Sequence, residues 1–185
     1  MRELLQLAKA RPGVLNYAGA GAGTNPHIAG ELFNYLGKVN IVVVQFKGGG
    51  PGLIATISGE IGITFTNIAE TAPYVAAKRL RALGVSSAKR VAAMPDIPTI
   101  AEAGLPGYEF VPWFGMLAPK GTPQGIVAML NEKLKKILGS PDQAKLFAQR
   151  GLDVIASSPD EFASHLKKEL EKWGKVIRER GMRAD

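Results

Sequence analysis

The feature that most restricts the fold is a regular alternation of strand-like and helix-like segments over the first two thirds of the chain. The segment Asn40–Phe46 is β-branched and apolar on both faces, as expected for a strand buried inside a parallel sheet. The helical segment before it, residues 26–36, places Ile28, Leu32 and Phe33 on one face. This alternation predicts an α/β domain with a largely parallel sheet.

The other predicted elements continue this pattern. We expect helices over residues 2–10, 53–58 and 68–78, strands over 15–18, 61–66, 81–86 and 109–117, and a glycine-rich turn over 47–52. Beyond residue 120 the chain is helix-rich, because Thr122, Ser140 and Ser158 each precede a proline, which predicts an N-cap. The last helix should end near Arg180. Its expected buried face is Phe162, Leu166, Leu170, Trp173 and Ile177.

Composition excludes several kinds of chemistry. The chain has no cysteine, so disulfides, thiolate metal sites and a cysteine nucleophile are excluded. Its two histidines, His27 and His165, have no closely spaced partner ligands, so no metal site is expected. The formal charge of +7 is mixed with acidic residues along helical faces and is not interleaved with aromatics, so no nucleic-acid partner is expected.

Neither the apolar runs nor the first residues point to a membrane or export segment. A run such as Ile41–Val44 is far shorter than the roughly 20 residues of a membrane span. The start, Met1–Leu7, contains Arg2 and Glu3 and lacks the apolar core of a secretory signal peptide. From these residues alone we expect no signal peptide in this chain.

The strongest local signal is the strand, glycine-rich loop and helix at residues 16–27. Small residues allow a ligand to approach the backbone, and amides at a helix N-terminus suit an anion. A glycine-rich connection without a ligand explains the same residues equally well. The nucleotide fingerprints fail, because Thr24 stands where glycine or alanine is needed and no Gly-Lys-Ser/Thr follows.

Two further segments should open at the same edge of the sheet. Lys47 and Gly48 follow the second predicted strand, and Asn67 follows the third. Lys47 could neutralise an acid or be a solvated turn lysine, and Asn67 could bind a ligand or cap the next helix. The chain lacks a serine nucleophile elbow, so hydrolysis is not expected.

Taken in order, several motifs along the whole chain resemble one family, the tripartite tricarboxylate transporter substrate-binding receptors, also called Bug or TctC. The matching segments are 15–24, 27–33, 46–48, 80–83, 95–104, 113–115 and 118–123. The resemblance implies a periplasmic-binding-protein type II fold, in which two α/β lobes close like a Venus flytrap. It also implies a periplasmic receptor that hands a small carboxylate to membrane permease subunits, with no enzymatic activity and no cofactor.

The resemblance assigns residues 1–112 to the family's second, ligand-binding lobe. It assigns 113–185 to the returning strand and helices of an incomplete first lobe. Apolar faces of that returning segment then need a cover, and we expect a homodimer or an exchanged assembly. The ligand itself is left open among dicarboxylates, tricarboxylates, acidic amino acids and aromatic acids.

The site that the resemblance implies surrounds the first glycine-rich loop. Its expected ligand-binding residues, which would hydrogen-bond a carboxylate, are Ala20, Gly21, Ala22, Gly23, Thr24, His27, Lys47, Gly48 and Asn67. Many family members carry an acidic residue just before the asparagine, where this chain has Thr66. Two other functions remain open at this point: a non-transport interaction or regulatory protein that keeps the receptor scaffold, and a nucleotide-using enzyme.

Overall fold

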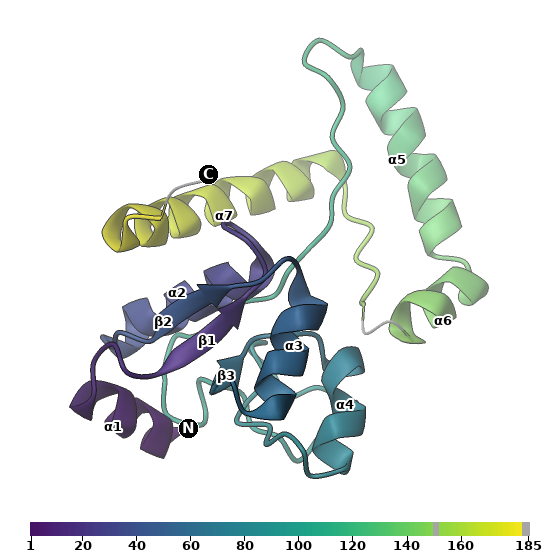
Figure 1. Cartoon of the computed structure of the whole chain (residues 1–185). Coiled ribbons are helices and arrows are strands. Elements are labelled where there is room, and N and C mark those ends of the chain that lie inside the picture. The colour runs from purple at the N-terminus through teal and green to yellow at the C-terminus, as the bar shows by residue number, and fades with distance from the viewer. Residues whose placement is uncertain (150–151, 183–185) are drawn as a thin grey trace. The chain divides into compact units, whose positions relative to one another are not determined.

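The computed structural model describes residues 1–149 and 152–182 and divides them into two compact units. Met1–Pro112 form the first unit together with residues 176–182, and the second unit lies within Trp113–Lys175. The elements of the first unit are α1 (Arg2–Ala10), β1 (Asn16–Gly19), α2 (Asn25–Gly37), β2 (Val42–Gln45), α3 (Gly49–Ser58), β3 (Ile63–Thr64) and α4 (Ile68–Ala76) (Figure 1). The second contains α5 (Gln124–Leu138), α6 (Pro141–Gln149) and most of α7 (Pro159–Arg180), whose last turn belongs to the first unit.

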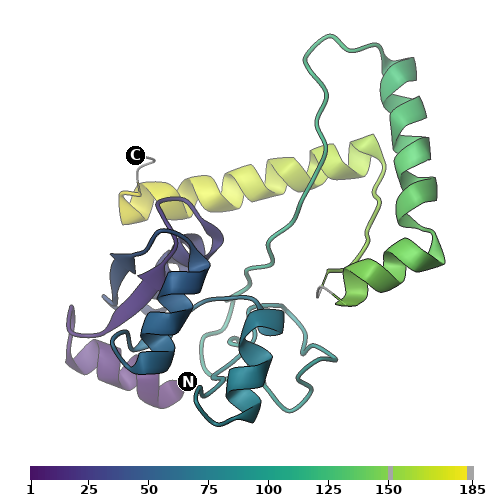
Figure 2. The same ribbon diagram turned by 45° about the vertical axis from the view of Figure 1, so that its right-hand side comes forward.

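The first unit is built on a parallel sheet with strand order β2-β1-β3. The chain leaves β1 toward β2 on one side and then crosses back to β3 on the other. Right-handed crossovers in opposite directions place their helices on opposite faces. Accordingly α2 covers one face and α3 the other, and both contact β1 (Figures 1 and 2). In such sheets the carboxyl end of the strand where the direction reverses is where ligands bind.

Adjacent residues of β1 serve the two faces of the sheet, as the period of two requires. Tyr17 packs on α2, where its ring lies so close to Gly30 that a Cβ at position 30 would overlap it. Ala18 points to the other face and clusters with Ala55 and Ile61. The central strand therefore connects both layers of the core.

An aromatic cluster fills the layer between the sheet and α2. The ring centroids of Tyr17 and Phe65 are 5.8 Å apart, those of Phe33 and Phe65 are 6.0 Å apart, and those of Phe33 and Tyr108 are 6.2 Å apart. The Tyr108 hydroxyl donates to the carbonyl oxygen of Ala29 at 3.0 Å, which fixes residues 105–110 against α2. Edge-to-face pairs of this kind add to the stabilisation from burial.

Several strand predictions differ from the structure. Asn40–Phe46 was expected to be buried on both faces, but β2 is an edge strand and Val42 is 42% exposed. The predicted strands at 81–86 and 109–117 are not strands, apart from an isolated bridge between Val85 and Thr99. The glycine-rich turn at 47–52 is largely the first turn of α3. Strand pairing depends on distant partners, which local patterns do not specify.

In the second unit, α7 contacts the segment that precedes α5. Trp113 packs edge-on against Phe162 at 5.5 Å between centroids, and its Nε1–H donates to Glu169 at 3.2 Å. The N-cap predicted at Ser158 is present and forms a capping box, since the Glu161 carboxylate accepts from the Ser158 amide at 2.8 Å. Thr122, in contrast, is not an N-cap, because α5 begins at Gln124 with Pro123 in the cap position.

Of the apolar stripe predicted to be buried along α7, Phe162, Leu166 and Trp173 are half-buried and the other two residues are exposed. Leu170 is 68% exposed and Ile177 is 40% exposed, whereas Val176 is the buried residue of this helix. Helix α5 has no buried residue, although Met129 and Ile137 are apolar. Within residues 1–149 and 152–182, no helix has the combination of length and apolar character needed to cross a membrane.

Candidate functional site

The three parallel strands end at one edge of the sheet, and the predicted site residues follow those ends. Two hydrogen bonds join the first two loops directly: the Phe46 amide donates to the Gly19 carbonyl oxygen at 3.0 Å, and the Gly21 amide donates to Gln45 Oε1 at 2.8 Å. The third strand is in register with the first at Thr64 and Ala18, so Asn67 follows three residues beyond this pair. All three loops therefore open at the carboxyl edge.

The loop after β1 is held in shape by its own residues. The Thr24 hydroxyl donates to the Gly21 carbonyl oxygen at 2.7 Å, and the Gly23 amide donates to Nδ1 of His27 at 3.0 Å. Gly21 and Gly23 have φ angles of 114° and 71°, which side chains other than hydrogen adopt rarely. Thr24 and His27, expected to contact a ligand, serve in this structure as braces of the loop.

Other amides of the same loop remain available to an anion. Among the described residues, no hydrogen-bond acceptor faces the amides of Ala20 and Ala22. The first hydrogen bond within α2 runs from the Ile28 amide to the Thr24 carbonyl oxygen, so the amides of Asn25 and His27 lie ahead of it. The first turn of α2 thus presents donors toward the edge of the sheet.

The loop after β2 contributes a second helix start and a cation. Gly48, with φ of 99°, is the N-cap of α3 and has no side chain with which to cap it. The amides of Gly49 and Gly50 therefore lie in an uncapped first turn. Lys47 is exposed, and the ion pairs formed within the described residues do not include it. Donors and a positive charge thus follow β2.

The third loop is more fully engaged in local contacts. The Asn67 Oδ1 accepts from the Ala69 amide at 3.0 Å, so Asn67 is the N-cap of α4. The Thr66 hydroxyl donates to Glu70 at 2.9 Å. The capping alternative for Asn67 is therefore what the structure contains, and its side-chain NH2 group is the part left to meet a ligand.

One residue of the site was not predicted from the sequence. Gln45, the last residue of β2, places its side-chain oxygen over Gly19 and receives the amide of Gly21. A Cβ at Gly19 would overlap this side chain and Val43 Cγ2, so a larger residue there would force a neighbouring side chain to shift. In the sequence, the only local indication of this role is that Gln45 is a polar residue at the end of an otherwise apolar strand.

Buried groups support the loop from below. Tyr17, 1% exposed, donates its hydroxyl to Glu31 Oε1 at 3.0 Å and also lies 3.3 Å from the His27 carbonyl oxygen. Burial and the neighbouring Glu31 carboxylate raise the pKa of Tyr17 far above its ordinary value of 10.0. The hydroxyl therefore stays protonated as a donor at any physiological pH.

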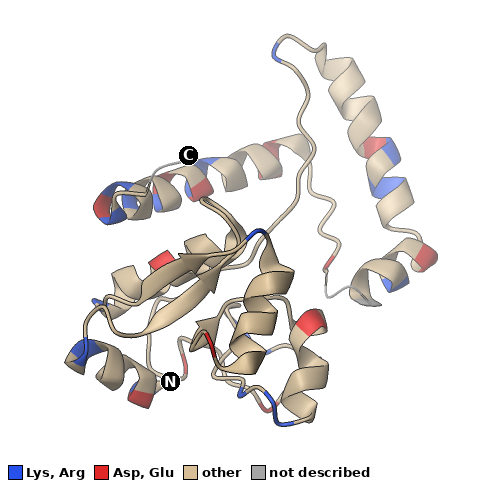
Figure 3. Cartoon of the chain, viewed as in Figure 1, with Lys and Arg blue, Asp and Glu red and all other residues tan. Residues whose placement is uncertain are grey.

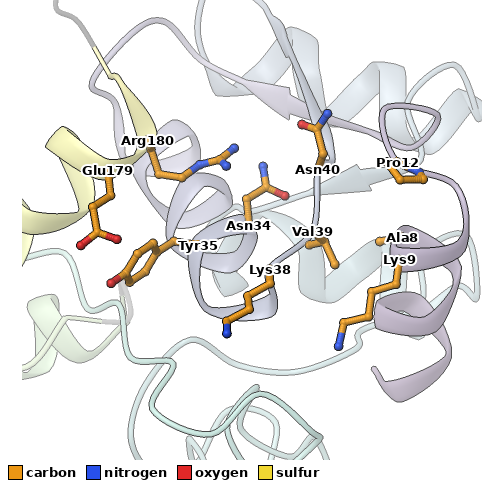
Figure 4. A pocket seen from close by; sticks show the side chains of 10 residues that line it. All are labelled: Ala8, Lys9, Pro12, Asn34, Tyr35, Lys38, Val39, Asn40, Glu179 and Arg180. Atoms are coloured by element: carbon orange, nitrogen blue, oxygen red, sulfur yellow. The ribbon is translucent and has the colours of Figure 1, made fainter.

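A cavity of about 430 Å³ lies elsewhere, at the other end of α2. Its lining includes Lys9, Lys38, Asn40 and Arg180, which lie around it in Figure 4. Pro12 and Asn40 precede β1 and β2, so the cavity is at the amino edge of the sheet. Arg180 is already paired with Glu31, and the Glu179 carboxylate lies in the same lining as the two exposed lysines. We therefore place the candidate site at the carboxyl edge.

Charge and ligand types limit the chemistry that the described residues offer. Basic and acidic residues are interspersed along α7 (Figure 3), as expected of a solvated face. Among residues 1–149 and 152–182, no group of three or more histidine or carboxylate side chains is arranged to hold a metal ion. Backbone donors, amide side chains and one lysine are suited to binding an anion.

Comparison with known proteins identifies the family of this chain. The family model described as tripartite tricarboxylate transporter family receptor, TctC, matches residues 1–182. A UPF0065 protein in the tcbD-tcbE intergenic region of Pseudomonas sp. (strain P51) is 36% identical over 184 residues, which are 99% of this chain and 55% of that protein. Protein BugT of Bordetella pertussis is 32% identical, over 96% of this chain and 55% of its own length. The chain thus spans about half the length of these relatives.

Solved structures show the same fold. A structure described as R. palustris Rpa4515 with adipate matches with a TM-score of 0.83 and 34% identity, covering 100% of this chain and 62% of that one. MatC from Rhodopseudomonas palustris with bound malate matches with a TM-score of 0.78 and 30% identity, over 96% and 61% of the two chains. A periplasmic binding protein, BugD, matches with a TM-score of 0.79. The chain belongs to the TctC family of tripartite tricarboxylate transporter receptors and has their periplasmic-binding-protein fold.

Proposed function

We propose that this chain forms the ligand-binding lobe of a periplasmic solute receptor that captures a small carboxylate. The observation that carries the proposal is the convergence of two helix starts, α2 and α3, whose first-turn amides lack side-chain caps among the described residues. Helix N-termini attract anions through these amides and the helix dipole. The adjoining Lys47 adds a full positive charge at the same edge.

Within this proposal the predicted site residues divide into two groups. The donors to the ligand are the amides of Ala20 and Ala22, the first-turn amides of α2 and α3 next to Gly48, the Lys47 ammonium and the Asn67 side-chain amide. Gly21, Gly23, Thr24 and His27 hold the loop in the shape that presents those donors, through bonds of 2.7 to 3.0 Å. Binding is the whole activity, and no covalent step is proposed.

Dicarboxylates are the ligands we favour. Two relatives of this fold have structures described with adipate and with malate, and both are dicarboxylic acids. The edge of this lobe offers donors for one carboxylate at α2 and α3. The second carboxylate would then be bound by the opposing lobe, and the loaded receptor would deliver its ligand to the membrane permease subunits of a tripartite transporter.

The domain assignment is part of the same proposal. Residues 1–112 are the family's second lobe, and 113–185 are the returning segment of its first lobe. The second unit leaves Phe114 83% and Leu117 72% exposed. In a preparation of this 185-residue chain, a second copy is the available polypeptide that can cover such apolar surface, and we propose that the chain self-associates there.

The direct test is binding of adipate and malate by isothermal titration calorimetry and thermal shift. A ligand at one hundred times its dissociation constant should stabilise the protein by about 2.7 kcal/mol. The uncharged diamide of adipic acid is the matched control and should not bind. Lys47→Gln should weaken adipate binding about fivefold, for a lost interaction of about 1 kcal/mol, while Lys9→Gln at the amino edge should not.

Three outcomes would contradict the proposal. Stabilisation by ATP or NAD without any response to carboxylates would favour the nucleotide-using enzyme. A loss of adipate binding in Lys9→Gln with no change in Lys47→Gln would move the anion site to the cavity at the amino edge. If no carboxylate and no nucleotide binds to or stabilises the protein, the interaction or regulatory function becomes the better explanation.

A further inference from the structure

A buried carboxylate beneath the candidate site is paired with the far end of the chain. Glu31 in α2 is 7% exposed, and its Oε2 accepts from Nε of Arg180 at 2.7 Å. Arg180 is the last residue of α7, 149 positions away, and both residues belong to the first unit. A buried charge is tolerated only when it is paired and hydrogen-bonded, so this pair anchors the last turn of α7 to α2.

The other oxygen of the same carboxylate faces the central strand. Glu31 Oε1 accepts from the Tyr17 hydroxyl at 3.0 Å and from Asn34 Nδ2 at 3.5 Å. Asn34 is itself fixed, since it exchanges hydrogen bonds of 2.8 and 2.9 Å with the backbone of Ile41. Asn34 is therefore fixed by contacts that do not involve the carboxylate.

The contacts continue from Tyr17 to the loop of the candidate site. The Tyr17 hydroxyl lies 3.3 Å from the His27 carbonyl oxygen, and His27 Nδ1 accepts the Gly23 amide at 3.0 Å. His27, Glu31 and Asn34 are spaced four and three residues apart, so they share one face of α2. Because Nδ1 accepts this hydrogen bond, it carries no hydrogen of its own in this arrangement.

These contacts form one continuous path from Gly23 through His27, Tyr17 and Glu31 to Arg180, in which the Tyr17 hydroxyl donates its single hydrogen to Glu31 and lies 3.3 Å from the His27 carbonyl oxygen. We propose that Arg180 is a positioning residue for the candidate site: by holding Glu31 it orients Tyr17, which in turn fixes the first turn of α2 and the Gly23 loop. The proposal deepens the proposed function, on which its consequence for ligand affinity rests. Loss of the contact between Arg180 and Glu31 would therefore change the shape of the loop that binds a carboxylate in the proposed function.

The test compares two glycine amides that each donate to a side chain in the same unit. Gly23 donates to His27 at 3.0 Å and Gly62 donates to Asn16 Oδ1 at 2.9 Å, but only Gly23 lies on the proposed path. Amide hydrogen exchange and ¹⁵N spectra of the His27 ring are measured on the ligand-free 185-residue chain. The variants are Arg180→Gln and Tyr17→Phe, which keeps the aromatic ring against Gly30.

We expect both variants to raise the ratio of the Gly23 exchange rate to the Gly62 rate about three- to tenfold, which is what one lost hydrogen bond produces. The His27 ring should also change from one tautomer to a mixture. Arg180→Lys, which keeps a cation, should restore much of the wild-type ratio. Arg90→Gln is the matched control, because it removes the ion pair with Glu102 at 2.9 Å, which is off the path, and should leave the ratio unchanged.

A general loss of stability would accelerate both amides equally and leave the ratio unaltered, and this result in both variants would overturn the proposal. Adipate affinity is measured separately by calorimetry. If the wild-type chain binds adipate, Arg180→Gln and Tyr17→Phe should weaken it about three- to tenfold, again unlike Arg90→Gln. If the wild type does not bind adipate, the proposed function fails while the exchange ratio still decides the positioning role.

Discussion

Gln45 reaches across from β2 and accepts the amide hydrogen of Gly21 at 2.8 Å, which ties the loop after β1 to the neighbouring strand. The contact uses the side-chain oxygen alone, so a carboxylate in the same position would keep it. Glutamate at position 45 would add a negative charge where we propose that an anion binds. The change therefore separates the shape of the loop from its electrostatics.

We predict that Gln45→Glu weakens adipate binding about fivefold or more, because two like charges a few ångströms apart repel by about 1 kcal/mol even in a solvated site. The loss should shrink at high salt, since screening reduces the repulsion. Calorimetry at low and high ionic strength measures both effects. Gln6→Glu makes the same change on the exposed side of α1 and should have no effect; equal losses in both variants would contradict a site at the carboxyl edge.

Gly30→Ala should destabilise the first unit by about 2 kcal/mol, because the added Cβ overlaps the Tyr17 ring and overpacking of a core costs roughly 1–3 kcal/mol. Urea unfolding followed by circular dichroism gives the change. Gly125→Ala is the matched control: it lies in α5 with nothing within 4 Å of its added Cβ, so helix propensity should make it neutral or slightly stabilising. Comparable stability of the two variants would be inconsistent with this packing.

Alkaline pH should destabilise the fold through two tyrosines. Burial raises the pKa of both Tyr17 and Tyr108 well above the ordinary value of 10.0, and the Glu31 carboxylate raises that of Tyr17 further. Because the folded pKa exceeds the unfolded one, this stabilisation is complete below about pH 10 and is lost as the pH rises above it. Urea unfolding from about pH 9 to about pH 11 should show a steep loss of stability.

Tyr17→Phe provides the control for this titration, since it removes one of the two groups. Its stability should fall less steeply above about pH 10 than that of the wild type. Tyrosinate absorbance offers an independent measurement, in which Tyr17 and Tyr108 ionise only as the chain unfolds. Ionisation of all four tyrosines in a folded protein would show that these two hydroxyls are accessible to solvent.

At acid pH the relevant group is Glu102. The Arg90 guanidinium and the Thr99 amide donate to its carboxylate and hold the pKa of Glu102 below its usual 4.5. A lowered folded pKa means that the stabilisation is present above the unfolded pKa and disappears as the pH falls through the folded one. Wild type and Arg90→Gln should therefore differ most near neutral pH and converge in acid; a constant difference in urea midpoints across that range would refute this assignment.

The 185-residue chain should self-associate through its second unit. Light scattering at micromolar concentration measures the mass of the particle. Replacing Phe114 and Leu117 by serine should shift the particle toward the monomer, because these side chains are 83% and 72% exposed and apolar. Ile54→Ser, at a position 67% exposed in the first unit, is the control and should not. A wild-type chain that remains monomeric would contradict the proposed assembly.

The features that the sequence predicted well are those with local causes. Helix α1 follows its predicted bounds, and the Ser158 capping box forms because its residues are three apart. The glycine-rich loop opens before α2, as expected of glycines followed by proline in a first helical turn. The likeness to the TctC family, which depended on ordered motifs along the whole chain, was confirmed by the family match.

What could not be predicted depends on contacts between distant segments. The exposed edge position of β2 follows from strand order, which a run of valines does not encode. The role of Gln45 depends on Gly21 in another strand's loop, 24 positions away. The pairing of Glu31 with Arg180 spans 149 positions, and nothing in either neighbourhood distinguishes them from solvated surface residues. Which residues hold the glycine-rich loop in shape also emerged only from their hydrogen bonds.

The overlap between a Cβ at position 30 and the Tyr17 ring also has a meaning for how sequences of this fold can diverge. The size of the residue at either of these two positions limits the size of the residue at the other. A lineage that acquires alanine or serine at position 30 loses stability unless residue 17 becomes smaller as well. A smaller residue 17 lacks the hydroxyl that donates to Glu31. The buried Glu31 carboxylate then has one hydrogen-bond partner fewer, so substitution of Glu31 becomes favourable in turn.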